Sequence, residues 1–116
     1  MKGLRRVLLG HFGSVLRMGL DDLLRERGYE VVAEGELDAT LVDRLVDALP
    51  DVVMLDLDSD HGPETARAIS AAFPSIKVVA FSANHQTMRI FPRFHRGESY
   101  DMTLSTEGLL DTVRST

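Results

Sequence analysis

Three acidic side chains, Asp56, Asp58 and Asp60, follow a short apolar run at residues 52–55. A continuous apolar run bounded by turn residues predicts a strand that is buried on both faces. In open α/β sheets, ligands bind at the carboxyl ends of such strands. Asp56 is therefore a candidate nucleophile, metal ligand or charge sensor, and Asp58 is a weaker candidate for a second metal ligand.

The spacing of the three carboxylates does not complete a known calcium loop. An EF-hand would need Gly at the position of His61 and Glu at the position of Arg67. The Asp56-Leu57-Asp58 pattern also lacks the later motifs of a haloacid-dehalogenase-type phosphatase. A solvated acidic loop that caps the following helix remains the alternative for Asp58 and Asp60.

Two further polar side chains are expected at the same end of the sheet. His11 follows the first predicted strand, where it is a ligand, a pH-sensitive cap on Asp56 or an ordinary loop residue. Ser82 directly follows the fourth predicted strand, where its hydroxyl either hydrogen-bonds locally or acts as a switch. A small enzyme built on Asp56, His11 and Ser82 is disfavoured, because the sequence has no nucleophile-elbow or cofactor-loop signal. We expect no enzymatic activity.

The elements that must position these residues alternate along the chain. Strands are predicted at residues 6–10, 29–34, 52–56, 76–81 and 99–103, and helices at 14–27, 41–49, 63–73 and 109–113. Residues 85–96 are ambiguous: Met88, Phe91 and Phe94 have helical spacing, but Pro92 should kink or end a helix. The alternation predicts a flavodoxin-like (βα)5 three-layer sandwich with a parallel sheet in the order 2-1-3-4-5. Residues 1–116 are expected to form a single domain.

Several segments together resemble the receiver domain of two-component response regulators, in particular the type that precedes a helix-turn-helix output domain. The matching segments are residues 17–20, 41–57 and 66–83. The resemblance implies that Asp56 is the phospho-acceptor and that Ser82 is the switch hydroxyl. It also implies a histidine kinase or an effector domain as a partner.

The sequence departs from that family at its charged positions. His11 and Phe12 replace an acidic pair that binds Mg²⁺ in the family, and no Lys occurs within residues 97–106, where the family carries one. Mg²⁺ requires oxygen ligands, which neither replacement supplies well. We therefore expect no cofactor and no useful rate of phosphorylation at Asp56. The alternative is a phospho-accepting receiver that uses Asp56 with atypical Mg²⁺ ligands.

Basic and aromatic residues are mixed in one segment of this acidic chain. An interaction face is predicted at Arg89, Phe91, Arg93, Phe94 and Arg96. A protein partner or a homodimer is expected to bind through residues 88–103. Single-stranded nucleic-acid binding is one alternative; the other is that Phe91 and Phe94 are core residues and the arginines are solvated.

Composition narrows the remaining possibilities. The chain has 116 residues, of which 44% are hydrophobic and 27% are charged, and its net charge is −5. This charge disfavours nucleic acids and anionic membranes as partners. The absence of cysteine excludes disulfides and thiolate catalysis and fits a reducing compartment. No apolar stretch is long enough to span a bilayer, so a cytoplasmic protein is expected.

Overall fold

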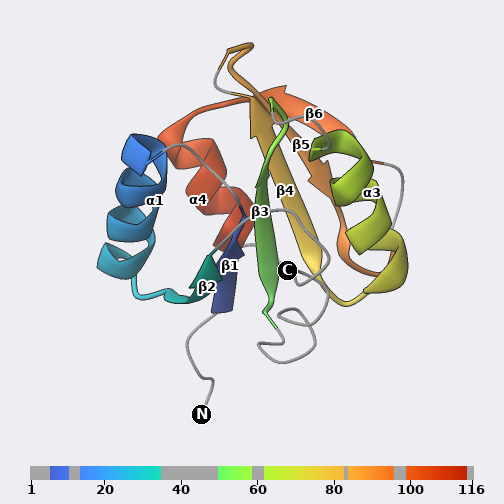
Figure 1. The fold of residues 1–116 in the computed structure, drawn as a ribbon, viewed down its shortest axis with the longest axis horizontal. Helices are drawn as coiled ribbons and strands as arrows, with labels where there is room; N and C mark the ends of the chain where they lie inside the picture. The colour runs from blue at the N-terminus through green and yellow to red at the C-terminus, as the bar shows by residue number, and fades with distance from the viewer. Residues whose placement is uncertain are drawn as a thin grey trace.

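Figure 1 shows a computed structural model of the chain, in which one sheet lies between helices. The structure describes residues 6–10, 14–34, 50–58, 62–82, 84–95 and 99–114. The strands are β1 (Arg6–Leu9), β2 (Glu30–Glu34), β3 (Val52–Asp56), β4 (Lys77–Ser82), β5 (Thr87–Phe91) and β6 (Tyr100–Thr103). The helices are α1 (Ser14–Glu26), α3 (Gly62–Ala72) and α4 (Thr106–Arg114), and a 3-10 turn (Arg93–His95) follows β5. The predicted helix at 41–49 lies outside the described residues.

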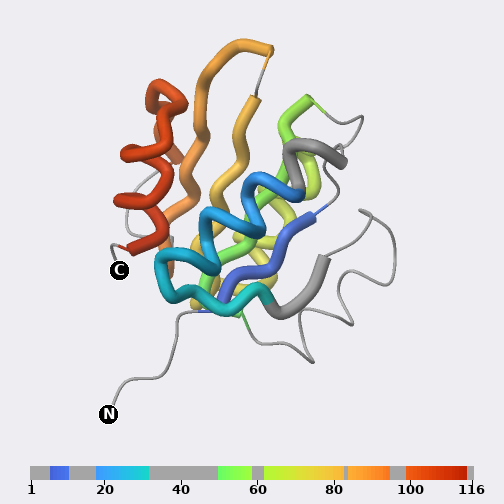
Figure 2. Tube along the Cα trace, turned by 90° about the vertical axis from the view of Figure 1, so that its left-hand side faces the viewer, coloured from blue at the N-terminus to red at the C-terminus, as the bar shows by residue number. Residues whose placement is uncertain are grey.

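The sheet has the order β2-β1-β3-β4-β5-β6. The first four strands in this order pair in parallel, with Val53 between Leu8 of β1 and Val78 of β4. Strand order and direction are therefore as predicted for this part of the sheet. Figure 2 shows these strands side by side, with α1 crossing in front of them. The fold is flavodoxin-like, with β3 and β4 at the centre of the sheet.

Alternate residues of the central strands pack against opposite layers. Val52 and Met54 of β3 share a buried cluster with α1 and α4, and Val53 and Leu55 share another with α3. The α1 and α4 side of this core comprises Leu20, Leu24, Leu109 and Val113 in the helices and Val79, Phe81, Met88 and Ile90 in the sheet. The core thus forms two layers, one on each face of the sheet. Figure 1 shows the helices that cover these layers, with α1 and α4 on one side of the sheet and α3 on the other.

The outer part of the sheet differs from the prediction. Strand β5 runs antiparallel to β4, and only residues 83–86 separate the two strands. So short a connection makes a hairpin, because a parallel crossover needs about a dozen residues or more. Gln86 supplies the turn with a left-handed φ of 53°. Residues 87–91 therefore form a strand and not a helix. Met88 and Ile90, two residues apart, both point into the core.

The predicted strand at 99–103 is present as β6, but not in the predicted place. It pairs antiparallel with β5, with Met102 opposite Met88 and Tyr100 opposite Ile90. It therefore runs parallel to β4 but lies one strand farther out. Strands β5 and β6 together form an antiparallel edge, which stands beyond β4 where a helix and a fifth parallel strand were expected.

Helix α4 returns from this edge to the α1 side of the sheet. Its C-terminal turn is attached to the sheet by Lys77, whose buried Nζ donates to the carbonyl of Thr112 at 2.9 Å. None of the helices in the described part of the chain is long and apolar enough to cross a membrane.

Candidate functional site

Asp56 ends β3 at the carboxyl edge of the sheet, where the parallel strands finish. Its side chain is half-buried, and its Oδ1 accepts a hydrogen bond from the backbone N–H of Asp58 at 2.9 Å. This is an Asx turn, in which a side chain stabilises the backbone two residues later. The predicted position of Asp56 at the end of a buried central strand is confirmed.

Ser82 and Asp58 join the loops that follow β4 and β3. The Ser82 hydroxyl donates to Asp58 Oδ1 at 2.6 Å, and its oxygen accepts from the His85 N–H at 3.0 Å. Asp58 Oδ2 in turn accepts from the Asn84 N–H at 3.3 Å. The Ser82 hydroxyl is thus hydrogen-bonded locally in this structure, and its role as a switch stays a prediction.

Sequence reasoning did not pair Asp58 with Ser82. The sequence predicts Asp58 in a solvated loop or, with Asp56, at a metal. In the structure its exposed carboxylate instead bonds to Ser82 and to the Asn84 N–H in the turn between β4 and β5. The available signal was topological: both residues follow adjacent strands and so must meet at one edge. His11, Phe12 and Asp60 lie outside the described residues.

The described residues at this edge do not fit the magnesium site that the resemblance implies. Mg²⁺ needs several oxygen ligands in near-octahedral geometry, but both carboxylate oxygens of Asp58 already accept hydrogen bonds. Among the described residues, no three Asp, Glu or His side chains are grouped so that they could hold a metal. His11 and Phe12 stand in the sequence where the family has two acids.

The lysines do not supply the missing positive charge within the described fold. The sequence has two, Lys2 and Lys77, and Lys2 lies outside the described residues. Lys77 begins β4, so it lies at the amino edge, a strand length away from Ser82 at the other end of β4. It is buried there and bonded to α4, which excludes it from the surroundings of Asp56.

The residues of the predicted interaction face do not gather on one surface. Phe91 is 8% exposed and belongs to the buried cluster beneath α3, so it cannot anchor a partner. Phe94 is 61% exposed and has a left-handed φ of 56°. The core alternative holds for Phe91 and not for Phe94. Arg96 lies outside the described residues.

The two described arginines of that face have different roles. Arg93 lies mostly inside the fold, where its Nη2 donates to the carbonyl of Asp51 at 3.0 Å and approaches the Asp51 carboxylate. Asp51 also accepts from the Arg6 N–H at 2.8 Å, so it joins β1, β3 and the 3-10 turn. Arg93 is therefore structural.

Arg89 remains at the surface, on the antiparallel edge. Its Nε donates to Asp101 Oδ1 at 2.9 Å across the β5–β6 pair. That hydrogen bond, together with the Coulomb attraction of Asp101, raises the pKa of Arg89 above its ordinary value. The charge of Asp101 is thus neutralised within its own chain.

Strand β6 lies within residues 88–103, the segment predicted to bind a partner, and it is the exposed part of that segment's sheet. All four of its residues are exposed, including Tyr100 at 49% and Met102 at 38%. It is the last strand of the sheet, and no described strand pairs with its outer side. Such an edge presents unpaired backbone groups to other chains.

Comparison with known proteins assigns the fold to a class. No family model matches the chain. It is 26% identical over 95 residues to the chemotaxis protein CheY of Thermotoga maritima, covering 80% of this chain and 79% of that protein. The signal receiver domain of the response regulator NarL from Mycobacterium tuberculosis has a TM-score of 0.61 and 26% identity, over 71% of this chain and 68% of that one.

A second solved structure agrees with the first. A two-component response regulator of the LuxR family from Aurantimonas sp. SI85-9A1 has a TM-score of 0.58 and 30% identity, over 69% of this chain and 59% of that one. Sequence and fold together make this chain a response-regulator receiver domain.

Proposed function

We propose that this receiver domain is a pseudo-receiver, which signals through protein–protein contacts and does not depend on Mg²⁺-dependent phosphorylation of Asp56. The observation that carries the proposal is the state of the family's switch position. The Ser82 hydroxyl, 3% exposed, already donates to Asp58 and accepts from His85. A phosphoryl group on Asp56 would have to break a charge-assisted hydrogen bond to recruit this hydroxyl.

Charge neutralisation supports the same proposal. Phosphoryl transfer spreads negative charge over several oxygens, and cations must stabilise it. The acidic pair is replaced by His11 and Phe12, and Lys77 is bonded to α4 at the other edge of the sheet. Without the metal and the lysine, the transition state of phosphoryl transfer loses roughly several kcal/mol of electrostatic stabilisation, as when an oxyanion hole loses its donors. The domain then needs no cofactor and carries no enzymatic activity of its own.

Phosphorylation by a small donor tests this proposal directly. The full chain is incubated with acetyl phosphate, with and without Mg²⁺, and its intact mass is measured. Asp56→Asn is the matched control, and a magnesium-dependent receiver run in parallel verifies the donor. We expect no phosphoryl adduct at Asp56. A magnesium-dependent adduct that disappears in Asp56→Asn would contradict the proposal and establish the phospho-accepting alternative.

The contact surface we propose is the outer side of β6. The backbone N–H of Leu104 donates to the carbonyl of Gln86 at 2.8 Å, so these opposed residues form a hydrogen-bonded pair. Pairs alternate in antiparallel strands. The backbone groups of Tyr100 and Met102 are therefore directed to β5, and those of Asp101 and Thr103 to the outer edge.

The partner that this edge fits is a second copy of the chain. Antiparallel pairing of β6 with β6 about a two-fold axis places Asp101 opposite Thr103 of the partner subunit, and Met102 at the axis. Because Arg89 neutralises Asp101 and β6 contains no Lys or Pro, the edge has little protection against pairing.

Self-association tests the surface separately from the phosphorylation chemistry. Sedimentation of the full chain from micromolar to millimolar concentration should show a reversible monomer–dimer equilibrium. Met102→Lys should weaken the dimer by at least roughly tenfold, because a lysine on an edge strand blocks pairing. Met18→Lys, on α1 and 61% exposed in the wild type, is the matched control and should leave it unchanged. A monomer at every concentration, or equal effects of the two variants, would contradict the surface.

Other partners follow from the class. We expect an effector domain and an upstream histidine kinase, as two-component systems provide, and a cytoplasmic location. The LuxR-family likeness supports the effector domain. Nucleic acid is not an expected partner of this domain itself, because the net charge is −5.

A further inference from the structure

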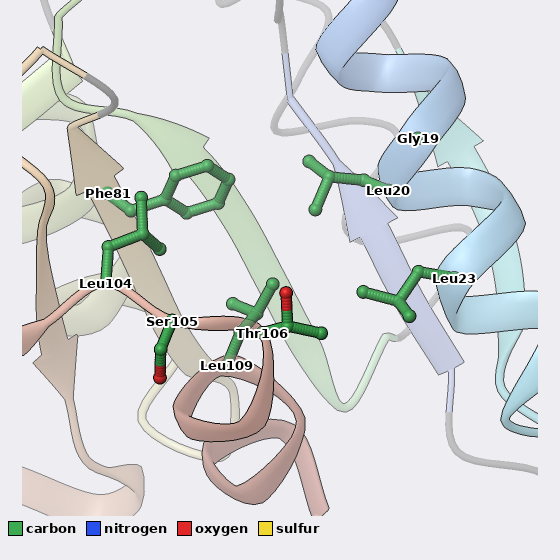
Figure 3. A pocket seen from close by; sticks show the side chains of 8 residues that line it. All are labelled: Gly19, Leu20, Leu23, Phe81, Leu104, Ser105, Thr106 and Leu109. Atoms are coloured by element: carbon green, nitrogen blue, oxygen red, sulfur yellow. The ribbon is translucent and has the colours of Figure 1, made fainter.

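An apolar pocket of about 470 Å³ lies between α1 and the start of α4 (Figure 3). Phe81, near the end of β4, forms one side of it. The helix α1 contributes Gly19, Leu20 and Leu23, and the junction of β6 with α4 contributes Leu104, Ser105, Thr106 and Leu109. Volumes of a few hundred Å³ with mainly apolar walls are typical of small-molecule sites.

The antiparallel edge explains why space is left there. The sheet prediction placed the strand at 99–103 next to β4, with the last helix following from it. In the structure β5 occupies that place, and β6 lies one strand farther out. Adjacent strands are about 4.8 Å apart, so the start of α4 is displaced from α1 by about that distance. Lys77 holds the other end of α4 on the sheet.

Of the helical glycines Gly19 and Gly108, only Gly19 lines the pocket and leaves its wall open. A Cβ at Gly108 of α4 would lie 2.9 Å from Ser105 Oγ and 3.4 Å from Met88 Cε, so close packing favours glycine there. A Cβ at Gly19 of α1 would meet nothing within 4 Å, and Gly19 has no positive φ. Glycine is unfavourable inside a helix, yet neither packing nor backbone conformation requires it at 19. Its effect is to leave the wall of the pocket without a side chain.

The lining determines what kind of molecule can bind. Among the residues that the structure describes, no charged side chain lines the pocket, and the large lining residues are leucines and one phenylalanine. Figure 3 shows the Thr106 hydroxyl directed into the space between the helices and the Ser105 hydroxyl directed away from it. Ser105 Oγ also caps α4 by accepting from the Gly108 N–H at 3.0 Å. Among the described lining residues, Thr106 therefore has the side-chain polar group available to a bound molecule.

We propose that this pocket is a binding site for a neutral, mainly apolar small molecule of about one or two rings that carries a single hydrogen-bonding group. The apolar part lies against Leu20, Leu23 and Phe81, and the polar group pairs with Thr106. A bound molecule links α1 to α4 across the gap left by the displaced β6. The site does not involve Asp56 and is independent of whether Asp56 is phosphorylated.

Fluorescence of a neutral dye tests the site. N-phenyl-1-naphthylamine has two aromatic parts and one N–H, and the chain contains no Trp to interfere. Titration of the full chain should give saturable enhancement with one site. Gly19→Leu should weaken binding by more than tenfold while melting at the same temperature or higher, because leucine fills the wall and favours helix. Thr106→Val should weaken binding between about two- and tenfold, the range for one hydrogen bond.

Two results would overturn the proposal: no saturable enhancement with the wild type, or unchanged affinity in a folded Gly19→Leu variant. If that variant fails to fold, methyl NMR of the wild type decides. Dye-induced shifts at the methyl groups of Leu20, Leu23, Leu104 and Leu109 would support the site. Shifts confined to methyl groups elsewhere would overturn it.

Discussion

The parallel half of the sheet and its antiparallel edge differ in how much of each strand is buried. In the parallel half, β1, β3 and β4 are buried on both faces and follow the order of the receiver class. At the edge, a hairpin replaces a helix, and β6 is exposed along its whole length. The features that receivers use for signalling chemistry belong to the first region, whereas the open edge and the pocket arise from the second. A receiver fold can therefore keep its frame while its contact surfaces are rebuilt.

The largest expected difference between the two regions is in stability. Leu55→Ala in β3 should lower the free energy of unfolding by about 2–5 kcal/mol, because it leaves a cavity in a fully buried layer. Tyr100→Ala in β6, 49% exposed, should cost less than about 1 kcal/mol. Chemical denaturation of both variants measures the difference. Equal losses would show that the edge is as integral to the core as β3.

Arg89, within β5, and Arg93, in the 3-10 turn that follows it, sharpen the comparison. Arg93→Ala should lower the free energy of unfolding by about 1.5–3 kcal/mol, because the Asp51 carbonyl loses its hydrogen bond from a mostly buried cation. Arg89→Ala removes an exposed ion pair with Asp101 and should cost less than about 1 kcal/mol. Thermal melts of the two variants give the order. If Arg89 proved the costlier substitution, the assignment of Arg93 as structural would be wrong.

Ser82 tests the link between the loops at the carboxyl edge. Ser82→Ala should lower the free energy of unfolding by about 1–2 kcal/mol, since it removes a hydrogen bond to the charged Asp58 and leaves the His85 N–H without its acceptor. Amide hydrogen exchange at Asn84 and His85 should accelerate in the same variant. Unchanged exchange there would mean that the Ser82–Asp58 bond does not hold the turn.

The smallest expected effects distinguish Gly19 of α1 from Gly108 of α4. Gly19→Ala should raise the free energy of unfolding by up to about 1 kcal/mol, because alanine favours helix and its Cβ meets nothing. Gly108→Ala should give no such gain, because its Cβ displaces the Ser105 hydroxyl that caps α4, at a cost of about 1 kcal/mol. Denaturation curves of both variants measure this difference. Equal stabilisation by the two substitutions would contradict the prediction.

The parallel part of the fold could be predicted because the residues that mark its strands and helix ends act locally in the sequence. The apolar run at residues 52–55, the glycine at 28 and the proline at 74 mark strands and helix ends without reference to distant residues. Segment 85–96 was ambiguous because Met88 fits both periods: with Phe91 and Phe94 at helical spacing, and with Ile90 in a strand. The short turn through Gln86 and the pairing with β4 decide between them, and both depend on tertiary structure.

The site was predictable in position but not in detail. Parallel topology placed Asp56 and Ser82 at one edge, as the structure confirms. The bond between Ser82 and Asp58 depends on the hairpin turn, which the sequence did not reveal. Arg93 was expected at a surface, and its bond to Asp51 was not predicted, because Asp51 lies far away in the sequence. The pocket could not be predicted, because it arises from the separation of α1 and α4.

The most direct test of the pseudo-receiver account is an amide NMR titration of the full chain with Mg²⁺, followed by beryllofluoride, which mimics a phosphoryl group. The account predicts no specific shifts at Asp56, at Ser82 or along β5 and β6. Saturable shifts at Asp56 and Ser82 that spread to the antiparallel edge would contradict it, because they would show a working switch with different metal ligands.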